Sequence, residues 1–382
     1  MKILMIDYEY APLGGGGGVF NRQLAEELSN RHEVTVITSQ FDQMPREEMI
    51  NHVRVRRVPV VGRVDRNVAS LISLFAFFPA SLNAGFQLLK REKYDIIHSF
   101  FAIPSALPGI ILSNLFKLPH LVSLLGGDIY DPSKFLSPHR FPLLKQTVTK
   151  IIKDSDKVIS LSNDIKEKVY QYFNVDCPID VIHLGIPKPQ FPPINRSDIG
   201  ILPDHKVLIT VGRLVERKGV DALIFIVKEL ADPEIRLLIV GDGPKRLELE
   251  KCAIESGVKD QIRFMGNVSD DDKFGLLNIA DAYVSTSVHE GFGIVFLEAM
   301  AAHLPVISYD HGGQKDFLIN GKTGFIVPLG MKDKLKEAIR LVLSDNLLRN
   351  EIKEYNRHYV KRFYIDQCAK DYERQYQKLI SS

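Results

Sequence analysis

The sequence predicts an α/β protein built from two doubly wound units, each with a mostly parallel sheet covered by helices. Short apolar runs of strand length alternate with longer amphipathic segments, which is typical of parallel strands joined by crossover helices. The 382 residues exceed what one hydrophobic core usually organises. A segment with four prolines, residues 185–198, separates two series of apolar runs. These three observations predict the fold class.

The first series predicts strands at residues 2–6, 33–38, 53–58, 95–98, 120–124, 157–161 and 180–183. The second series predicts strands at residues 205–211, 236–240, 261–264, 282–285, 305–308 and 324–327. Helical spacing of apolar residues continues from Lys332 to the end. We therefore expect domains at 1–185 and 205–360, a linker at 186–204, and a last helix at 361–382. Whether that helix caps the second domain or returns to the first is left open.

The composition is that of a globular protein and disfavours several kinds of partner. Apolar residues make up 45% of the chain, and 49 basic side chains nearly balance 47 acidic ones. A net charge of +2 is too small to attract nucleic acid by charge alone. The cysteines, Cys177, Cys252 and Cys368, lack the spacing of a disulfide framework or a zinc site. We expect a cytoplasmic protein.

An uncharged stretch at residues 67–89 is long enough to span a membrane. Pro79 interrupts it, and polar side chains are scattered along it at Asn67, Ser70, Ser73, Ser81, Asn83 and Gln87. Polar side chains are costly in hydrocarbon. We therefore expect a buried or interfacial helix, and the stretch leaves open a peripheral association with the inner face of the membrane.

Ligands of doubly wound sheets bind beyond the carboxyl ends of the strands, where the strands pass into helices. The first such place holds five glycines, residues 14–18, before a predicted helix. Their backbone can approach a ligand closely, and the helix start offers N–H groups to an anion. The loop either contacts phosphate or sugar, or it is only flexible. A P-loop is disfavoured because no Lys-Ser/Thr pair follows.

Two cations follow the first strand of the second series. Arg213 and Lys218 lie in the segment GRLVERKG, where they can clamp a pyrophosphate and stabilise the charge that develops as it leaves. The alternative is a pair of solvated surface charges, because the start of a helix usually favours acids.

The segment HEGFGIVFLEAMA, residues 289–301, is the most informative. Glu290 precedes a Gly-Phe-Gly loop, after which a helix can point its first N–H groups at a phosphate. Glu298 lies one turn beyond Ile294 on the same face, where its carboxylate can reach two ribose hydroxyls. The residues around Glu298 are apolar, so an unpaired charge would be costly there. One segment can thus hold both ends of a nucleoside diphosphate.

Together these motifs resemble the retaining glycosyltransferases of family 4, which have the GT-B architecture of two Rossmann-like domains facing each other across a cleft. GRLVERKG is followed by GDGP at 241–244, GNVSDDD at 266–272 and EGFGIVFLEA with its Glu-x7-Glu spacing. The glycine loop, LGGD at 125–128 and GGQKDFLINGKTGFIVP at 312–328 also fall in the family's order. The resemblance covers essentially the whole chain.

The resemblance implies a role for each matching residue. Arg213 and Lys218 would bind the donor pyrophosphate, and Glu298 would bind the ribose. Glu290 would contact the donor sugar or the reaction centre. The phosphates would lie on the backbone at Gly293, Ile294 and Val295, and the preceding Gly291 and Phe292 would belong to the same donor-binding loop. The base would lie against Gly241, Gly243 and Val268. The phosphate site would be closed from the first domain by Gly15, Gly16, Gly17 and Gly18.

Leu125 departs from the family pattern, because many relatives have a histidine there that is a candidate contact to the donor sugar. Retaining members are thought to use the leaving phosphate oxygen itself to accept the acceptor's proton. Cationic stabilisation of that phosphate would then be the protein's main contribution. Asp128 is the nearest polar substitute, and it either contacts a sugar or caps the following turn.

The acidic run Asp270, Asp271 and Asp272 contains an Asp-x-Asp spacing that could suggest a metal site. We interpret the run as the capped start of a helix and expect neither metal nor cofactor.

The leading hypothesis is sugar transfer from a nucleotide donor to a polysaccharide, a lipopolysaccharide core or another lipid-linked glycan. A UDP-sugar is expected because UDP donors are commonest in the family. A hydrolysing sugar-nucleotide epimerase of the same architecture and a nucleotide-sugar-binding protein without turnover are the alternatives.

Overall fold

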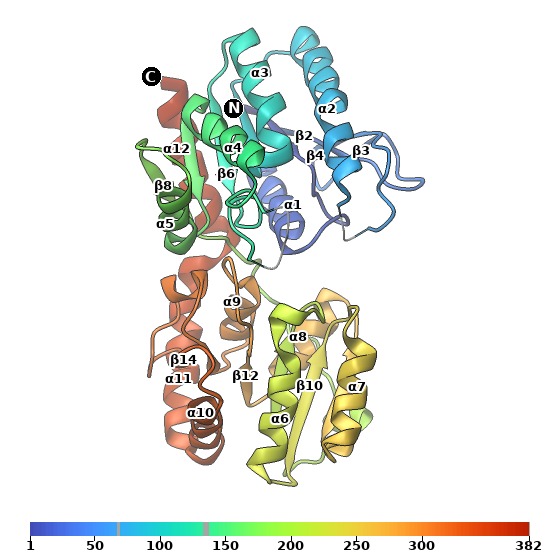
Figure 1. Ribbon diagram of the computed structural model, residues 1–382, viewed down its shortest axis with the longest axis vertical. Helices are drawn as coiled ribbons and strands as arrows, with labels where there is room; N and C mark the ends of the chain where they lie inside the picture. The colour runs from blue at the N-terminus through green and yellow to red at the C-terminus, as the bar shows by residue number, and fades with distance from the viewer. Residues whose placement is uncertain (67–68, 133–136, 382) are drawn as a thin grey trace. The chain divides into compact units, whose positions relative to one another are not determined.

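The computed structural model describes residues 1–66, 69–132 and 137–381, which form two compact units (Figure 1). Unit 1 comprises Met1–Pro187 and Phe363–Ser382, and unit 2 comprises Lys188–Arg362. The last helix, whose place the sequence left open, therefore belongs to unit 1. Much of the segment expected as a linker belongs to unit 2, where Arg196 donates to the carbonyl of Ile279 at 2.5 Å.

The sheet of unit 1 has eight strands in the order β3-β4-β2-β1-β5-β6-β7-β8. They are β1 (Lys2–Asp7), β2 (Glu33–Ser39), β3 (Glu47–Ile50), β4 (Val53–Val58), β5 (Ile96–Phe100), β6 (His120–Leu124), β7 (Lys157–Ser160) and β8 (Ile179–Val181). Neighbours pair in parallel, except that β3 pairs antiparallel with β4. Strand β3 was not predicted, because this edge strand has no fully buried residue and so no apolar run.

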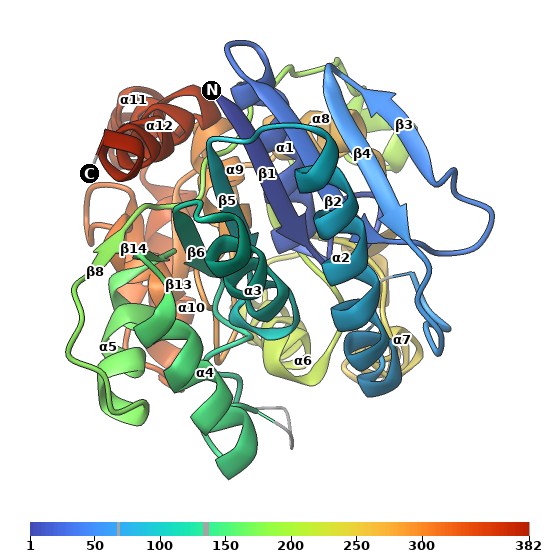
Figure 2. The ribbon, with the colours of Figure 1, turned by 90° about the horizontal axis from the view of Figure 1, so that it is seen from above.

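Helices cover both faces of this sheet. They are α1 (Gly16–Ser29), α2 (Leu71–Arg91), α3 (Leu107–Phe116), α4 (Pro142–Asp154), α5 (Asn163–Tyr172) and α12 (Ile365–Ser381). Helices α2 and α3 lie side by side on one face, while α1 and α12 pack together on the other (Figure 2). The last helix buries Cys368, Ala369, Tyr372 and Tyr376, whose helical spacing forms a single apolar stripe.

The uncharged stretch of the sequence forms most of α2. Among the described helices, α2 is the one long and apolar enough to cross a membrane by length and composition. Phe77 and Leu88 are buried in the core of unit 1, whereas Leu71, Ile72 and Phe75 near the start of the helix are exposed. Asn67 and Val68, at the beginning of the stretch, lie outside the described residues. The helix is therefore amphipathic, with one face packed and one face open.

The sheet of unit 2 has six parallel strands in the order β11-β10-β9-β12-β13-β14. They are β9 (Lys206–Val211), β10 (Ile235–Val240), β11 (Ile262–Gly266), β12 (Ala282–Val284), β13 (Val306–Tyr309) and β14 (Gly324–Val327). The chain places β10 on one side of β9 and β12 on the other. The strand order thus reverses between β9 and β12, and ligands of such sheets bind at this topological switch point.

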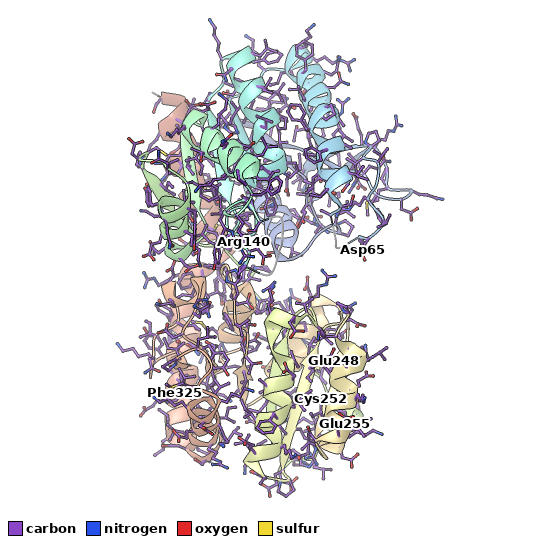
Figure 3. All side chains as sticks on the ribbon, viewed as in Figure 1. Asp65, Arg140, Glu248, Cys252, Glu255 and Phe325 are labelled. Atoms are coloured by element: carbon purple, nitrogen blue, oxygen red, sulfur yellow. The ribbon has the colours of Figure 1, made fainter. Side chains whose placement is uncertain are left out.

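The helices of unit 2 are α6 (Val220–Leu230), α7 (Arg246–Glu255), α8 (Asp270–Asn278), α9 (Ile294–Ala301), α10 (Lys332–Ser344) and α11 (Asn346–Tyr359). Its core joins side chains of the central strands to α6, α7 and α10, among them Leu223, Leu237, Ile307 and Ile339. The three cysteines are free thiols, and Figure 3 labels Cys252 on α7 with Glu248 and Glu255.

A buried polar network attaches α12 to the sheet of unit 1. The Nδ1 atom of His98 lies 2.7 Å from the Tyr376 hydroxyl, and its Nε2 atom lies 2.8 Å from the Ser123 hydroxyl. The Ser123 hydroxyl lies 2.9 Å from that of Tyr372. Burial lowers the pKa of His98 well below its ordinary value, so the ring is neutral and needs both partners. The network fixes which residues of α12 face β5 and β6.

We expect Tyr376→Phe to lower the free energy of unfolding by about 1–3 kcal/mol, because it leaves a buried ring nitrogen of His98 without its partner. The matched control is Tyr355→Phe, since the Tyr355 hydroxyl bonds to no residue in the described ranges. Chemical denaturation followed by circular dichroism measures both variants. Equal stability of the two variants would contradict an anchoring role for the network.

Candidate functional site

The residues predicted to bind the pyrophosphate and the donor sugar, Arg213, Lys218 and Glu290, lie at the switch point, on the loops that follow β9 and β12. The loop after β9 carries Arg213 and a short turn, Glu216–Lys218, before α6 begins. The loop after β12 runs to Gly293 and leads into α9. The two loops are joined by backbone groups: the Val288 N–H donates to the carbonyl of Arg217 at 2.9 Å. Each loop therefore helps to fix the position of the other.

A buried ion-pair cluster lies between these loops. The Nζ atom of Lys218 donates to Oε1 of Glu290, and the side chains of Lys218 and Glu290 are only 13% and 8% exposed. The Nη1 atom of Arg217 lies 3.5 Å from Oε2 of Glu290 and donates to the carbonyl of His289 at 3.0 Å. Burial raises the pKa of Glu290, but Lys218 and Arg217 outweigh burial and bring the pKa below its ordinary value. Glu290 is therefore a carboxylate at neutral pH.

Arg213 and Lys218, which the sequence analysis treated as a pair, differ in their surroundings. Lys218 is bound to Glu290, whereas Arg213 is exposed and pairs with no residue in the described parts of the chain. Gly212, the residue before Arg213, packs closely against Lys218: a Cβ atom built on Gly212 would lie 3.2 Å from the Lys218 Nζ. Both cations thus belong to one small region. The ammonium of Lys218 is engaged by Glu290, whereas the guanidinium of Arg213 is available to an anion.

The start of α9 offers backbone donors to an anion. Gly293 precedes the helix with a φ of +83°, and a Cβ there would lie 2.4 Å from the Phe296 ring, so only glycine fits. The N–H groups of Ile294 and Val295 donate to no described residue. Phe292 is buried against Phe317, with ring centroids 5.0 Å apart. The Gly-Phe-Gly loop is therefore anchored by an aromatic side chain, and the free amides follow it.

Glu298 is the second acidic residue of the motif, and it is not unpaired. Its Oε1 accepts from the Nζ of Lys273 at 2.7 Å, and the two side chains are 11% and 15% exposed. Burial raises the pKa of Glu298, and Lys273 only partly offsets this effect. Lys273 was not predicted as a site residue, because no sequence spacing shows that α8 and α9 bring these two side chains together.

The acidic run lies in the first turn of α8, at the capped start of a helix as expected. The cap of the helix is Ser269, whose hydroxyl accepts from the Asp272 N–H at 3.0 Å. The three aspartates occupy the first turn, where Asp270 pairs with Lys273 at 2.8 Å. Within the described residues, no cluster of three or more His, Cys, Asp or Glu side chains could hold a metal ion.

The residues expected near the base lie on the loops after β10 and β11. Gly241 and Gly243 belong to a loop that packs against the loop after β9, where the Leu214 N–H donates to the Asp242 carbonyl at 2.9 Å. Val268, after β11, is partly exposed. These glycines thus have a structural role in holding two loops together, and a contact with the base stays a prediction.

The glycine loop and Asp128 belong to unit 1. Gly15 precedes α1, and Gly16, Gly17 and Gly18 form its first turn. A Cβ on Gly18 would lie 2.5 Å from the Leu13 carbonyl oxygen, so close backbone packing requires that glycine. Asp128 accepts from the N–H groups of Ala102 at 2.6 Å and Leu125 at 3.1 Å. Burial raises the pKa of Asp128 to about 6. This geometry favours a positioning role for Asp128 over a direct sugar contact.

Comparisons with known proteins agree with this architecture. The model of the Glycosyltransferase Family 4 matches residues 14–188, and the model of Glycosyl transferases group 1 matches residues 193–359. An uncharacterized glycosyltransferase of Methanocaldococcus jannaschii is 32% identical over 364 residues, which is 90% of each chain.

Solved structures have the same fold. Sucrose-phosphate synthase from Thermosynechococcus elongatus superimposes with a TM-score of 0.86, at 24% identity and with full coverage of both chains. HepE of Anabaena in complex with UDP superimposes with a TM-score of 0.80, at 20% identity, over 99% of this chain and 100% of HepE. With two Rossmann-like units, the GT-B fold and a relative this similar, the chain belongs to the family 4 (group 1) glycosyltransferases.

Proposed function

We propose that the protein is a retaining glycosyltransferase that uses a nucleotide-diphosphate sugar, a UDP-sugar, as donor. The acceptor is a glycan or a lipid-linked glycan in the synthesis of a cell-surface polysaccharide or glycoconjugate. The observation that carries this proposal is the juxtaposition of the buried Glu290–Lys218 pair with the free amides that begin α9. The HepE structure, a complex with UDP, supports a UDP donor.

Each group of the site has a task in this reaction. The diphosphate lies on the amides of Ile294 and Val295, and Arg213 and Lys218 balance its charge. As the bond from the anomeric carbon to the phosphate oxygen breaks, these cations stabilise the growing negative charge on UDP. The acceptor hydroxyl forms the new bond on the same face, and its proton passes to the leaving phosphate oxygen. Glu290 accepts hydrogen bonds from hydroxyls of the donor sugar.

The two alternatives use the same nucleotide site and differ in product. A hydrolysing epimerase releases an epimerised sugar together with free nucleotide, and a binding protein leaves the donor intact. Neither is favoured by a particular contact in the described residues. A new glycosidic bond in the product distinguishes the transferase from both.

We propose further that the protein is cytoplasmic and associates with the membrane through the start of α2. Phe75 is 73% exposed and Ile72 is 64% exposed, and with the exposed Leu71 they gather at the start of one helix. Exposed apolar side chains that lie together, rather than singly, mark a membrane or protein contact. An amphipathic helix of this kind can place its apolar side chains at the lipid boundary. Such an attachment would bring the enzyme to a lipid-linked acceptor.

Replacing Lys218 by Ala should lower kcat by about 100- to 1,000-fold, because a cation that stabilises the leaving phosphate is lost. UDP release from UDP-glucose, UDP-galactose or UDP-N-acetylglucosamine measures the effect, with Lys228→Ala on the surface of α6 as control. Lys218→Ala also leaves Glu290 with Arg217 as its remaining cation and so can lower stability as well as turnover. Arg213→Ala therefore serves as the second variant, and it should slow turnover without changing the melting temperature. Normal turnover in both variants would remove these cations from the mechanism.

Replacing Glu298 by Gln should weaken nucleotide binding by about 1–3 kcal/mol, because a charged acceptor for the ribose hydroxyls is lost. Isothermal titration with UDP, GDP and ADP measures the affinity, and Glu248→Gln on the surface of α7 is the control. We expect UDP to bind most tightly. Undiminished affinity in Glu298→Gln would refute the ribose contact.

The double variant Ile72→Ser/Phe75→Ser should bind anionic phospholipid vesicles at least about tenfold more weakly, since burial of each apolar side chain contributes about 1.5–3 kcal/mol. Co-sedimentation with vesicles measures binding. Leu247→Ser is the matched control, because Leu247 is exposed on α7 of unit 2. Equal binding by the two variants would exclude α2 as the attachment.

A further inference from the structure

We propose that Lys273 is a positioning residue for the nucleotide: it holds the Glu298 carboxylate charged and oriented so that this carboxylate accepts hydrogen bonds from the ribose hydroxyls. The inference rests on the proposed function, in which Glu298 contacts the ribose. Lys273 lies outside the Glu-x7-Glu motif, and it acts through Glu298 rather than on the reacting atoms.

The contact with Lys273 engages only one of the two carboxylate oxygens of Glu298. Lys273 projects from α8 and Glu298 from α9, and their contact joins the Nζ of Lys273 to Oε1 of Glu298 at 2.7 Å. No residue in the described ranges donates to Oε2, although Glu298 as a whole is only 8% exposed. A nearly buried carboxylate with one engaged and one unengaged oxygen is suited to accept hydrogen bonds from the hydroxyls of a ligand.

The charges around Glu298 come from a small set of groups. Lys273 and Asp270 face it from α8, and the phenol of Tyr283 on β12 lies within electrostatic reach. Asp270 also pairs with Lys273 at 2.8 Å, but its side chain is largely exposed. Lys273 is therefore the cation that neutralises Glu298, and it limits the repulsion between this carboxylate and the phosphates of a nucleotide.

The pH dependence of binding follows from these groups. Burial raises the pKa of Glu298, Lys273 lowers it, and Asp270 raises it again. Without Lys273 only the raising influences remain, so the carboxyl takes up its proton at a higher pH. A protonated carboxyl loses part of its acceptor capacity. Nucleotide binding in such a variant must therefore weaken as the pH falls and recover as the pH rises.

The test is isothermal titration of wild type and Lys273→Met with UDP, GDP and ADP between about pH 6.5 and pH 9. We expect wild-type affinity to change little over this range. Lys273→Met should bind about tenfold more weakly at pH 7, a loss of about 1.4 kcal/mol, and should regain affinity toward pH 9. Lys273→Arg should bind like wild type. Wild type should bind the 2′-deoxy form of its nucleotide more weakly than the ribose form. Lys273→Met should discriminate less between the ribose and the 2′-deoxy nucleotide.

A double-mutant cycle separates a positioning role from a structural one. In the Glu298→Gln background, Lys273→Met should change affinity little, because the group through which it acts is already neutral. Lys228→Met on the surface of α6 is the control, and Lys273→Gln replaces Lys273→Met if the latter melts at a lower temperature. An equal loss in both backgrounds, or a loss independent of pH, overturns the inference.

Two further outcomes are distinct. If wild type binds nucleotide and Lys273→Met binds it equally well, this inference alone is refuted. Failure of wild type to bind UDP, GDP and ADP refutes the proposed function and this inference with it.

Discussion

The ion pair between Lys218 and Glu290 is the interaction on which the geometry of the site depends. It joins the loops that follow β9 and β12, the two strands between which the sheet order reverses. Breaking such a buried pair is destabilising, because Glu290 then keeps only the more distant Arg217, whose Nη1 atom lies 3.5 Å from Oε2, as its cation. The loop that carries Glu290 continues directly into Gly293 and α9. The positions of the free amides and of Glu298 are therefore tied to this contact.

Unit 2 contains two such ion pairs between an acidic residue of the motif and a lysine. Each acidic residue of the Glu-x7-Glu motif is nearly buried and paired with a lysine from another element. The energetic effects differ, because the cations near Glu290 outweigh burial whereas Lys273 only partly offsets it. Glu290 is thus held firmly as a carboxylate, and Glu298 depends more on its partner. Arg213 remains the exposed cation that a phosphate can recruit without displacing an internal contact.

Much of this arrangement could be predicted from the sequence, because strand-length apolar runs and the segment at 289–301 are local signals. The features that were not predicted depend on tertiary contacts or on a position at the edge of the sheet. Strand β3 lies at a sheet edge without an apolar run, and Lys273 meets Glu298 only because α8 and α9 pack together. The capping residue of α8, Ser269, was not singled out from the sequence; its hydroxyl accepts from the Asp272 N–H. Asp128 similarly binds backbone groups that sequence spacing could not identify.

The most direct test of the account is the structure of the protein in complex with UDP. We predict that the phosphates lie within hydrogen-bond distance of the Ile294 and Val295 amides, near Arg213 and Lys218. We also predict that a ribose hydroxyl contacts Oε2 of Glu298 while Lys273 stays on Oε1. A nucleotide bound away from the switch point of unit 2, or a ribose that does not reach Glu298, would contradict the account.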